Sequence, residues 1–148
     1  MTGCDRTGKG SGGSSFNGPE RSYPGVPFSK EHFNPRSKCP SGSGSIDNYG
    51  DPNQVRNCML VGLTDLDQSN TYAKNKMIGY LNKLVSVGVA GFRVDAAKHM
   101  WPKELEAIFN SVQNLNTEFF PPGRRPFIFL EVIDMSNEPI RGQHYAHM

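Results

Sequence analysis

Apolar residues between positions 69 and 88 recur at the spacing of one helical face, and polar residues fill the opposite face. Ser69 or Asn70 can cap the start of this predicted helix, and Gly88 can end it. A second helical pattern runs from Pro102, which suits the first turn of a helix, to Leu115. The apolar positions are Ala73, Met77, Tyr80, Leu81, Leu84 and Val85 in the first pattern, and Leu105, Ile108, Phe109 and Val112 in the second.

A short apolar segment that predicts a strand follows each helical pattern: VAGFRVD after the first, and PFIFLEVID after the second. The second segment is too apolar for a strand with one face in water, and such strands are typical of parallel sheets covered on both faces. The order helix, strand, helix, strand predicts a parallel α/β sheet or barrel.

The chain up to about residue 55 shows few helix or strand signals. The stretch TGKGSGGSS is rich in glycine and serine, which predicts a flexible loop. The spacing of the prolines excludes long helices in this part. Four aromatic residues here either pack a small irregular core or line a surface: Phe16, Tyr23, Phe28 and Phe33.

Composition excludes some classes of partner. The 148 residues carry a net charge of +2 and the basic residues are scattered, so we expect no nucleic-acid partner. No apolar run approaches the ~20 residues that span a membrane, so we expect no membrane partner. The start of the chain lacks the apolar segment of a secretory signal, so a secreted protein with this sequence would begin further upstream.

The three cysteines are Cys4, Cys39 and Cys58. An odd number without a C-x-x-C pair argues against a zinc ribbon or a thioredoxin-type site. They are either three reduced thiols, or one disulfide and a leftover thiol. Cys39 and Cys58 flank a loop rich in glycine, serine and asparagine, which suits a disulfide in an oxidising compartment.

Ionisable residues gather where the two predicted strands end. Arg93 and Asp95 close the first strand, and Glu131 closes the second, about one strand–helix–strand unit later. Active sites of α/β folds lie at this edge. Because neighbouring parallel strands lie ~4.8 Å apart, the two carboxyl groups can approach the ~5–5.5 Å that retaining glycoside hydrolases use.

We expect the two carboxyl groups to have different surroundings. Arg93 points to the same side of the strand as Asp95, which favours an ionised carboxylate and suits a nucleophile. Glu131 lies among apolar residues, which favours the protonated form and suits a proton donor. The alternative is a structural ion pair between Arg93 and Asp95. Lys98 and His99, taken alone, would form the start of a solvated helix.

Several stretches resemble the α-amylase family of glycoside hydrolases in its animal form. GFRVDAAKHMWP resembles the second conserved region of that family, and FIFLEVID resembles the third. GLTDLD resembles a short conserved segment of the domain that protrudes from the barrel, and GSGSIDNYGDPNQVRNC resembles animal members as well. The resemblance covers roughly Phe16 to Ile140, with the motifs in the expected order.

This resemblance implies an α/β fold that is part of a (β/α)8 TIM barrel, from about strand four to strand five. Residues 1–66 would form part of the loop-rich, calcium-binding domain B. Residues 67–140 would form a segment of the catalytic barrel. Residues 141–148 would form a divergent or truncated tail.

The resemblance also implies roles for single residues. Asp95 matches the catalytic nucleophile and Glu131 the general acid/base. Arg93 matches the arginine that keeps the nucleophile ionised and contributes to a chloride site. The positions that match substrate-binding residues are Tyr49, Arg93, Lys98, His99, Ile133 and Glu138.

A calcium site and a disulfide are implied in the same way. Asp65 matches a calcium carboxylate, while Arg56 and His99 match residues that offer backbone carbonyl oxygens. Calcium prefers such oxygen ligands, and here it would tie domain B to the barrel. Cys39 and Cys58 match a disulfide of the protruding domain.

The implied function is retaining endo-hydrolysis of α-1,4-glucosidic bonds in starch, glycogen or maltooligosaccharides. The complete enzyme would be a secreted monomer with structural Ca2+, and chloride is a candidate activator. This chain lacks the third catalytic Asp, which lies in a His-Asp motif after Glu131 in the family. It also supplies only two strands with open edges, so we expect it to be inactive alone and to form no stable barrel.

Two alternatives stay open. One is a short, non-catalytic product that binds calcium or glucan without turnover. The other is a different enzyme of the family, such as a maltase or a transglycosylase, which the stretches KHMWP and EVID favour less.

Overall fold

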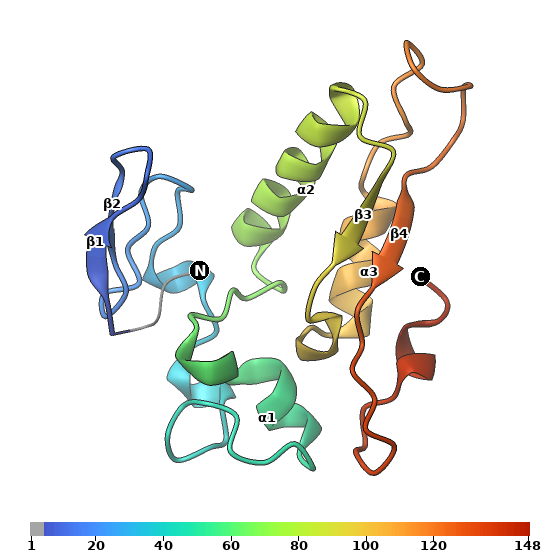
Figure 1. Cartoon of the computed structure of the whole chain (residues 1–148). Helices are drawn as coiled ribbons and strands as arrows, with labels where there is room; N and C mark the ends of the chain where they lie inside the picture. Colours follow the sequence, from blue (N-terminus) through green and yellow to red (C-terminus); the bar gives the residue numbers. More distant parts are fainter. Residues whose placement is uncertain (1–4) are drawn as a thin grey trace. The chain divides into compact units, whose positions relative to one another are not determined.

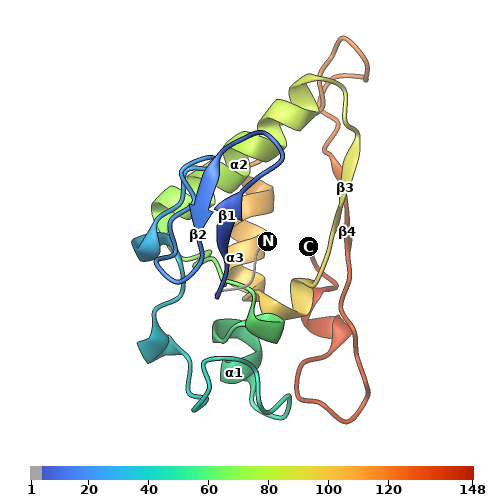
Figure 2. The same cartoon turned by 60° about the vertical axis from the view of Figure 1, so that its left-hand side comes forward.

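The computed structural model describes residues 5–148, and the chain divides into two compact units, Met1–Ala73 and Lys74–Met148. Figures 1 and 2 show the elements of each unit. None of the helices in the described part of the chain is both long enough and apolar enough to cross a membrane.

The first unit begins with a two-stranded antiparallel hairpin of β1 (Thr7–Lys9) and β2 (Ser15–Asn17). The stretch expected to be a flexible loop forms this hairpin and its turn. The amide of Gly10 donates to the carbonyl of Ser14 at 2.8 Å, and Gly13 takes a left-handed backbone with φ of +85°. Glycine allows this turn because it lacks a Cβ atom.

Short helical turns follow the hairpin: η1 (Lys30–His32), η2 (Arg36–Lys38), α1 (Pro52–Asn57) and η3 (Leu60–Gly62). The sequence pattern did not predict α1, which has too few residues for apolar periodicity to appear. Its start has a local signal, because Asp51 accepts a hydrogen bond from the amide of Asn53 at 2.9 Å and Pro52 occupies the first turn.

A disulfide between Cys39 and Cys58 closes the middle of the first unit, as the resemblance implies. Both cysteines are buried together with Phe33 and Val55. The guanidinium group of Arg36 stabilises the loop that follows Cys39. It donates to the carbonyls of Cys39, Ser41 and Gly42 at 2.9, 2.5 and 2.7 Å. Cys4 lies outside the described residues.

Helix α2 (Thr71–Ser86) confirms the first helical pattern. The side chain of Asn70 caps it by accepting from the amides of Tyr72 and Ala73 at 3.0 and 3.1 Å. Gly88 follows the last turn with φ of +99°, as expected for a residue that ends a helix.

The second unit contains β3 (Gly91–Val94), η4 (Ala97–His99), α3 (Pro102–Asn110), β4 (Phe127–Leu130) and η5 (Gly142–Tyr145). The strands β3 and β4 pair in parallel, with Gly91 opposite Phe127 and Arg93 opposite Phe129. Figure 1 shows them side by side, and Figure 2 shows α3 against one face of the pair. The predicted helix–strand–helix–strand order is therefore confirmed.

Helix α3 ends earlier than its apolar pattern predicted. The guanidinium group of Arg125 donates to the carbonyl of Phe109 at 2.6 Å and also to that of Val112. These carbonyls are therefore satisfied without a further helical turn. Val112 and Leu115 stay buried in a cluster with Val85 of α2, and partly buried Leu81, Phe92 and Phe120 pack against it.

The expectation that β4 is covered on both faces is wrong for this chain. Phe127 is 72% exposed and Phe129 is 56% exposed. Side chains alternate along a strand, so these two phenylalanines share a face with Glu131. The opposite face of the strand is half-buried on the α3 side, while nothing in the described chain covers the face with the phenylalanines.

Candidate active site at the ends of strands β3 and β4

One guanidinium group joins the two carboxylates that the sequence singled out. Arg93 Nη1 donates to Asp95 Oδ1 at 2.7 Å, and Arg93 Nη2 donates to Glu131 Oε1 at 2.8 Å. The parallel register places these residues together, because Asp95 and Glu131 each lie two positions beyond the Arg93–Phe129 pair, on the same face. Sequence reasoning predicted the Arg93–Asp95 contact but not the one with Glu131.

Glu131 is held more tightly than Asp95. Its Oε2 accepts from the amide of Ala96 at 3.0 Å, and its backbone carbonyl accepts from the amide of Ala97 at 3.0 Å. Its side chain is half-buried, whereas that of Asp95 is mostly exposed. Two ordered donors thus face the Glu131 carboxylate, so the expected apolar surroundings of this group are not what the structure has.

Lys98 and Glu138 form a further ion pair within the second unit. The side chain of Lys98 is only 5% exposed and that of Glu138 is 17% exposed. Both were predicted to bind substrate, and the structure brings them into direct contact. His99 is half-buried in the same short turn, η4, and Ile133 is 58% exposed beyond β4.

Asp134 is a residue that sequence reasoning missed. Its carboxylate accepts from the amides of Ser136 at 2.9 Å and Gly142 at 3.2 Å, and from the side chain of Arg141 at 3.1 Å. The bonds from the Ser136 and Gly142 amides, followed by that from Arg141, lower the pKa of Asp134 from its ordinary value. An Asp that bonds the amide two residues later is a recognisable turn signal, so the stretch DMS offered a clue.

The candidate calcium residues Arg56 and Asp65 lie in the first unit, whereas His99 lies in the second. Burial raises the pKa of Asp65 to about 7, although the side-chain amide of Asn34 donates to its Oδ2 at 2.7 Å and opposes this shift. Asn34 is itself buried, and its backbone amide donates to the carbonyl of Asp65 at 2.9 Å. The Asp65 carboxyl group is therefore buried beside a single side-chain donor.

Among residues 5–148 there is no group of three or more His, Cys, Asp or Glu side chains that could hold a metal ion. Calcium also takes backbone carbonyl oxygens, which a search for such side chains does not cover. Tyr49, predicted to stack on sugar, is partly exposed in the first unit.

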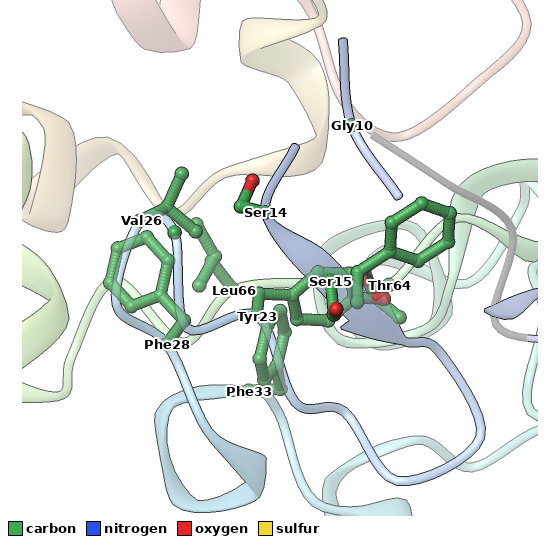
Figure 3. A pocket seen from close by; sticks show the side chains of 11 residues that line it. Gly10, Ser14, Ser15, Tyr23, Val26, Phe28, Phe33, Thr64 and Leu66 are labelled. Atoms are coloured by element: carbon green, nitrogen blue, oxygen red, sulfur yellow. Dashed lines mark hydrogen bonds between the residues drawn. The ribbon is translucent and has the colours of Figure 1, made fainter. Parts of the chain in front are cut away.

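Four aromatic residues of the first unit line a hollow of about 440 Å³ (Figure 3). Phe33 is buried at its base, while Phe16, Tyr23 and Phe28 are half-buried around it. The hydroxyl of Tyr23 donates to Thr64 Oγ1 at 3.3 Å. These residues therefore both pack together and line a surface, and none of the predicted site residues lies among them.

The structure is closely similar to that of α-amylase I from the earthworm Eisenia fetida. The TM-score is 0.94 and the sequences are 46% identical, over 98% of this chain and 29% of that one. An α-amylase of Oryzias latipes is 53% identical over 134 residues, and one of Pecten maximus is 49% identical over 146 residues. The chain is a homologue of animal α-amylases.

The homology covers nearly the whole chain but only part of each relative. The chain spans 26% of the Oryzias latipes α-amylase and 29% of the Pecten maximus one. No family model matches the chain. Since α-amylases contain a (β/α)8 barrel, the parallel β3–β4 pair with α3 packed on it is consistent with part of that barrel.

Proposed function

We propose that this chain forms the centre of an α-amylase that hydrolyses internal α-1,4-glucosidic bonds of starch and glycogen with retention of configuration. The observation that carries the proposal is the joining of Asp95 and Glu131 by Arg93 at adjacent strand ends. Retaining glycosidases need two carboxyl groups close together, and here one guanidinium group holds both.

In the proposed reaction, Glu131 gives a proton to the glycosidic oxygen while Asp95 attacks the anomeric carbon and forms a covalent glycosyl–enzyme ester. A water molecule then attacks the anomeric carbon, with Glu131 accepting its proton, and the ester bond to Asp95 breaks. Arg93 donates to the Asp95 carboxylate and orients it. Glu131 must exchange its bond with Arg93 for one with the glycosidic oxygen, and catalytic bonds often reach their final geometry only with substrate bound.

The proposed substrates are starch, glycogen and maltooligosaccharides. A mutant of the Eisenia fetida homologue has been crystallised with maltohexaose. In this chain we assign substrate contacts to Tyr49, Arg93, Lys98, His99, Ile133 and Glu138. The proposed barrel segment runs from about strand four to strand five, with residues 1–66 as part of domain B, and the complete protein is a secreted monomer.

We also propose a structural calcium ion held by the carboxylate of Asp65 and the carbonyls of Arg56 and His99. The raised pKa of Asp65 supports this assignment, because a bound cation would offset the cost of burying its charge. Chloride beside Arg93 is a further proposal, and there it would share the guanidinium group with Asp95 and Glu131, to which its two terminal nitrogens donate.

We propose that the 148-residue chain does not turn over substrate alone, because a third carboxylate in a His-Asp motif does not follow Glu131 within it. A non-catalytic product that binds calcium or glucan without turnover is the second candidate.

Starch hydrolysis in calcium and chloride tests these proposals on two proteins. One is the chain itself, and the other is a chimera in which the chain replaces the matching segment of the Eisenia fetida α-amylase I. We expect hydrolysis by the chimera and none by the chain. The isolated chain could instead hydrolyse starch and lose this activity in the Asp95→Asn variant. That result would refute the proposal that catalysis needs residues outside the chain. A folded but inactive chimera would favour the non-catalytic product.

A further inference from the structure

The segment that carries Lys98 and His99 is fixed at its start by Glu131. The amide of Glu131 donates to the carbonyl of Val94 at 2.9 Å, and the amides of Ala96 and Ala97 return bonds to its side chain and its carbonyl. Ala96 takes a left-handed backbone with φ of 52°, which costs energy for a residue with a Cβ atom. These bonds to Glu131 hold the strained residue in place.

The other end of this segment is fixed by Tyr145. The hydroxyl of Tyr145 lies 2.9 Å from the carbonyl oxygen of Met100 and 3.2 Å from that of Lys98, and its single O–H donates to both as a shared hydrogen bond. These carbonyls belong to the residues on either side of His99. The ring of Tyr145 is only 3% exposed, so a lost bond could not be replaced freely by bulk water.

Tyr145 is also tied to the loop that carries Glu138. This loop follows β4 and is closed at its base by Asp134, which bonds Ser136, Arg141 and Gly142. Ile140 within it is buried, which anchors the loop, and Tyr145 lies in the next turn, η5. The ion pair between Glu138 and Lys98 thus joins two segments that Tyr145 holds together.

We propose that Tyr145 is a positioning residue for substrate binding. Its hydroxyl fixes the turn Ala97–His99 against the Glu138 loop, so that the buried Lys98–Glu138 pair keeps half-buried His99 in a preformed position for a maltooligosaccharide. This role rests on the proposed α-amylase function. It differs from the role of Arg93, which contacts Asp95 and Glu131 directly.

A merely structural role would need only the buried ring. Tyr145→Phe keeps that ring and removes the hydroxyl, so it separates packing from the shared hydrogen bond. Tyr80→Phe is the matched control, because Tyr80 lies on α2 and is 64% exposed. Both variants are made in the chimera with the Eisenia fetida enzyme, which supplies the remainder of an α-amylase.

Two readouts test the proposal. Hydrogen–deuterium exchange of peptides covering residues 96–101 should become at least about threefold faster in Tyr145→Phe, while α2 and α3 exchange as before. The KM for maltohexaose should rise about three- to tenfold, the size expected from losing one buried hydrogen bond, with kcat changed by less than about twofold. Tyr80→Phe should match the wild type in both.

The outcomes separate this proposal from the one on which it rests. The wild-type chimera could hydrolyse starch normally while Tyr145→Phe leaves the KM, or the exchange at residues 96–101, unchanged. Either result would overturn the role of Tyr145 but not the proposed function. Faster exchange throughout the second unit would also overturn it, because it would indicate general loss of packing. A folded chimera without hydrolytic activity would overturn the proposed function, and the role of Tyr145 with it.

Discussion

Arg93 serves two carboxylates, which makes it the residue on which the candidate site depends most. Its contact with Asp95 follows from the two-residue period of one strand, and the sequence predicts it. Its contact with Glu131 depends on how β3 and β4 align, with Arg93 opposite Phe129. Strand register is set by packing along the whole sheet, so a single sequence could not predict this second contact.

Replacing Arg93 tests its double role. In the chimera, Arg93→Ala leaves both carboxylates without their shared partner, so kcat/KM for maltohexaose should fall at least about tenfold, because hydrogen bonds to charged groups are worth more than neutral ones. Arg124→Ala removes an exposed arginine as the control and should leave kcat/KM unchanged. An equal effect of the two substitutions would contradict the assignment of Arg93.

Asp65 gives a prediction about pH. Its pKa is raised from 3.8 to about 7 by burial, so the metal-free folded chain keeps a proton that the unfolded chain releases above about pH 4. The folded first unit should therefore lose stability as pH rises from about 4 to about 7 in a calcium chelator. The 13C resonance of the Asp65 carboxyl should titrate near pH 7, and calcium should move this titration to lower pH.

Asp65→Asn is the control for this titration, because it removes the resonance and should remove the associated pH dependence. A titration of Asp65 near pH 4 in the chelator would contradict the buried environment described for this carboxyl group. An unchanged titration in calcium would instead contradict the proposed calcium site.

The helices and strands of the second unit follow from the sequence, because a long amphipathic pattern is a strong signal. Asn70, Gly88 and Pro102 mark boundaries that the structure has. The hairpin β1–β2 and helix α1 were not predicted, since strands of three residues and a helix of six give no measurable period. Glycine turns, a capping aspartate and a disulfide stabilise this part of the chain instead of a periodic apolar pattern.

The cap of α2 can be tested directly. Asn70→Ala removes the acceptor for the amides of Tyr72 and Ala73, and should lower the free energy of unfolding by about 1 kcal/mol. Urea unfolding of the chimera, followed by circular dichroism, measures this change. Asn75→Ala, at an exposed position inside the same helix, should be neutral or slightly stabilising, since Ala favours helices more than Asn. Equal effects at the two positions would contradict the cap.

The second unit presents an uncovered sheet face, with Phe127 and Phe129 exposed beside the candidate site. The sequence predicted full coverage because the strand is so apolar, and in a closed barrel other strands would provide it. This chain spans less than a third of the length of the Oryzias latipes and Pecten maximus α-amylases, and the expectation of full coverage is wrong for the described chain.

This exposed face predicts self-association of the 148-residue chain. Large exposed apolar patches and open strand edges favour association, so sedimentation velocity should show species that grow with concentration. Phe129→Asp should reduce this association, whereas Val61→Asp, at an exposed position in the first unit, should not. A chain that stays monomeric at all concentrations would indicate that this face is covered in solution.

The measurement that tests the central claim most directly is the trapping of a covalent intermediate on Asp95. The Glu131→Gln chimera is mixed with a maltosyl fluoride, whose leaving group needs no proton, and its peptides are analysed by mass spectrometry. Since the amide introduced by this substitution cannot activate water, we predict that a maltosyl ester accumulates on the peptide that contains Asp95. An ester on another residue, or rapid turnover without any ester, would contradict the assignment of Asp95 and Glu131.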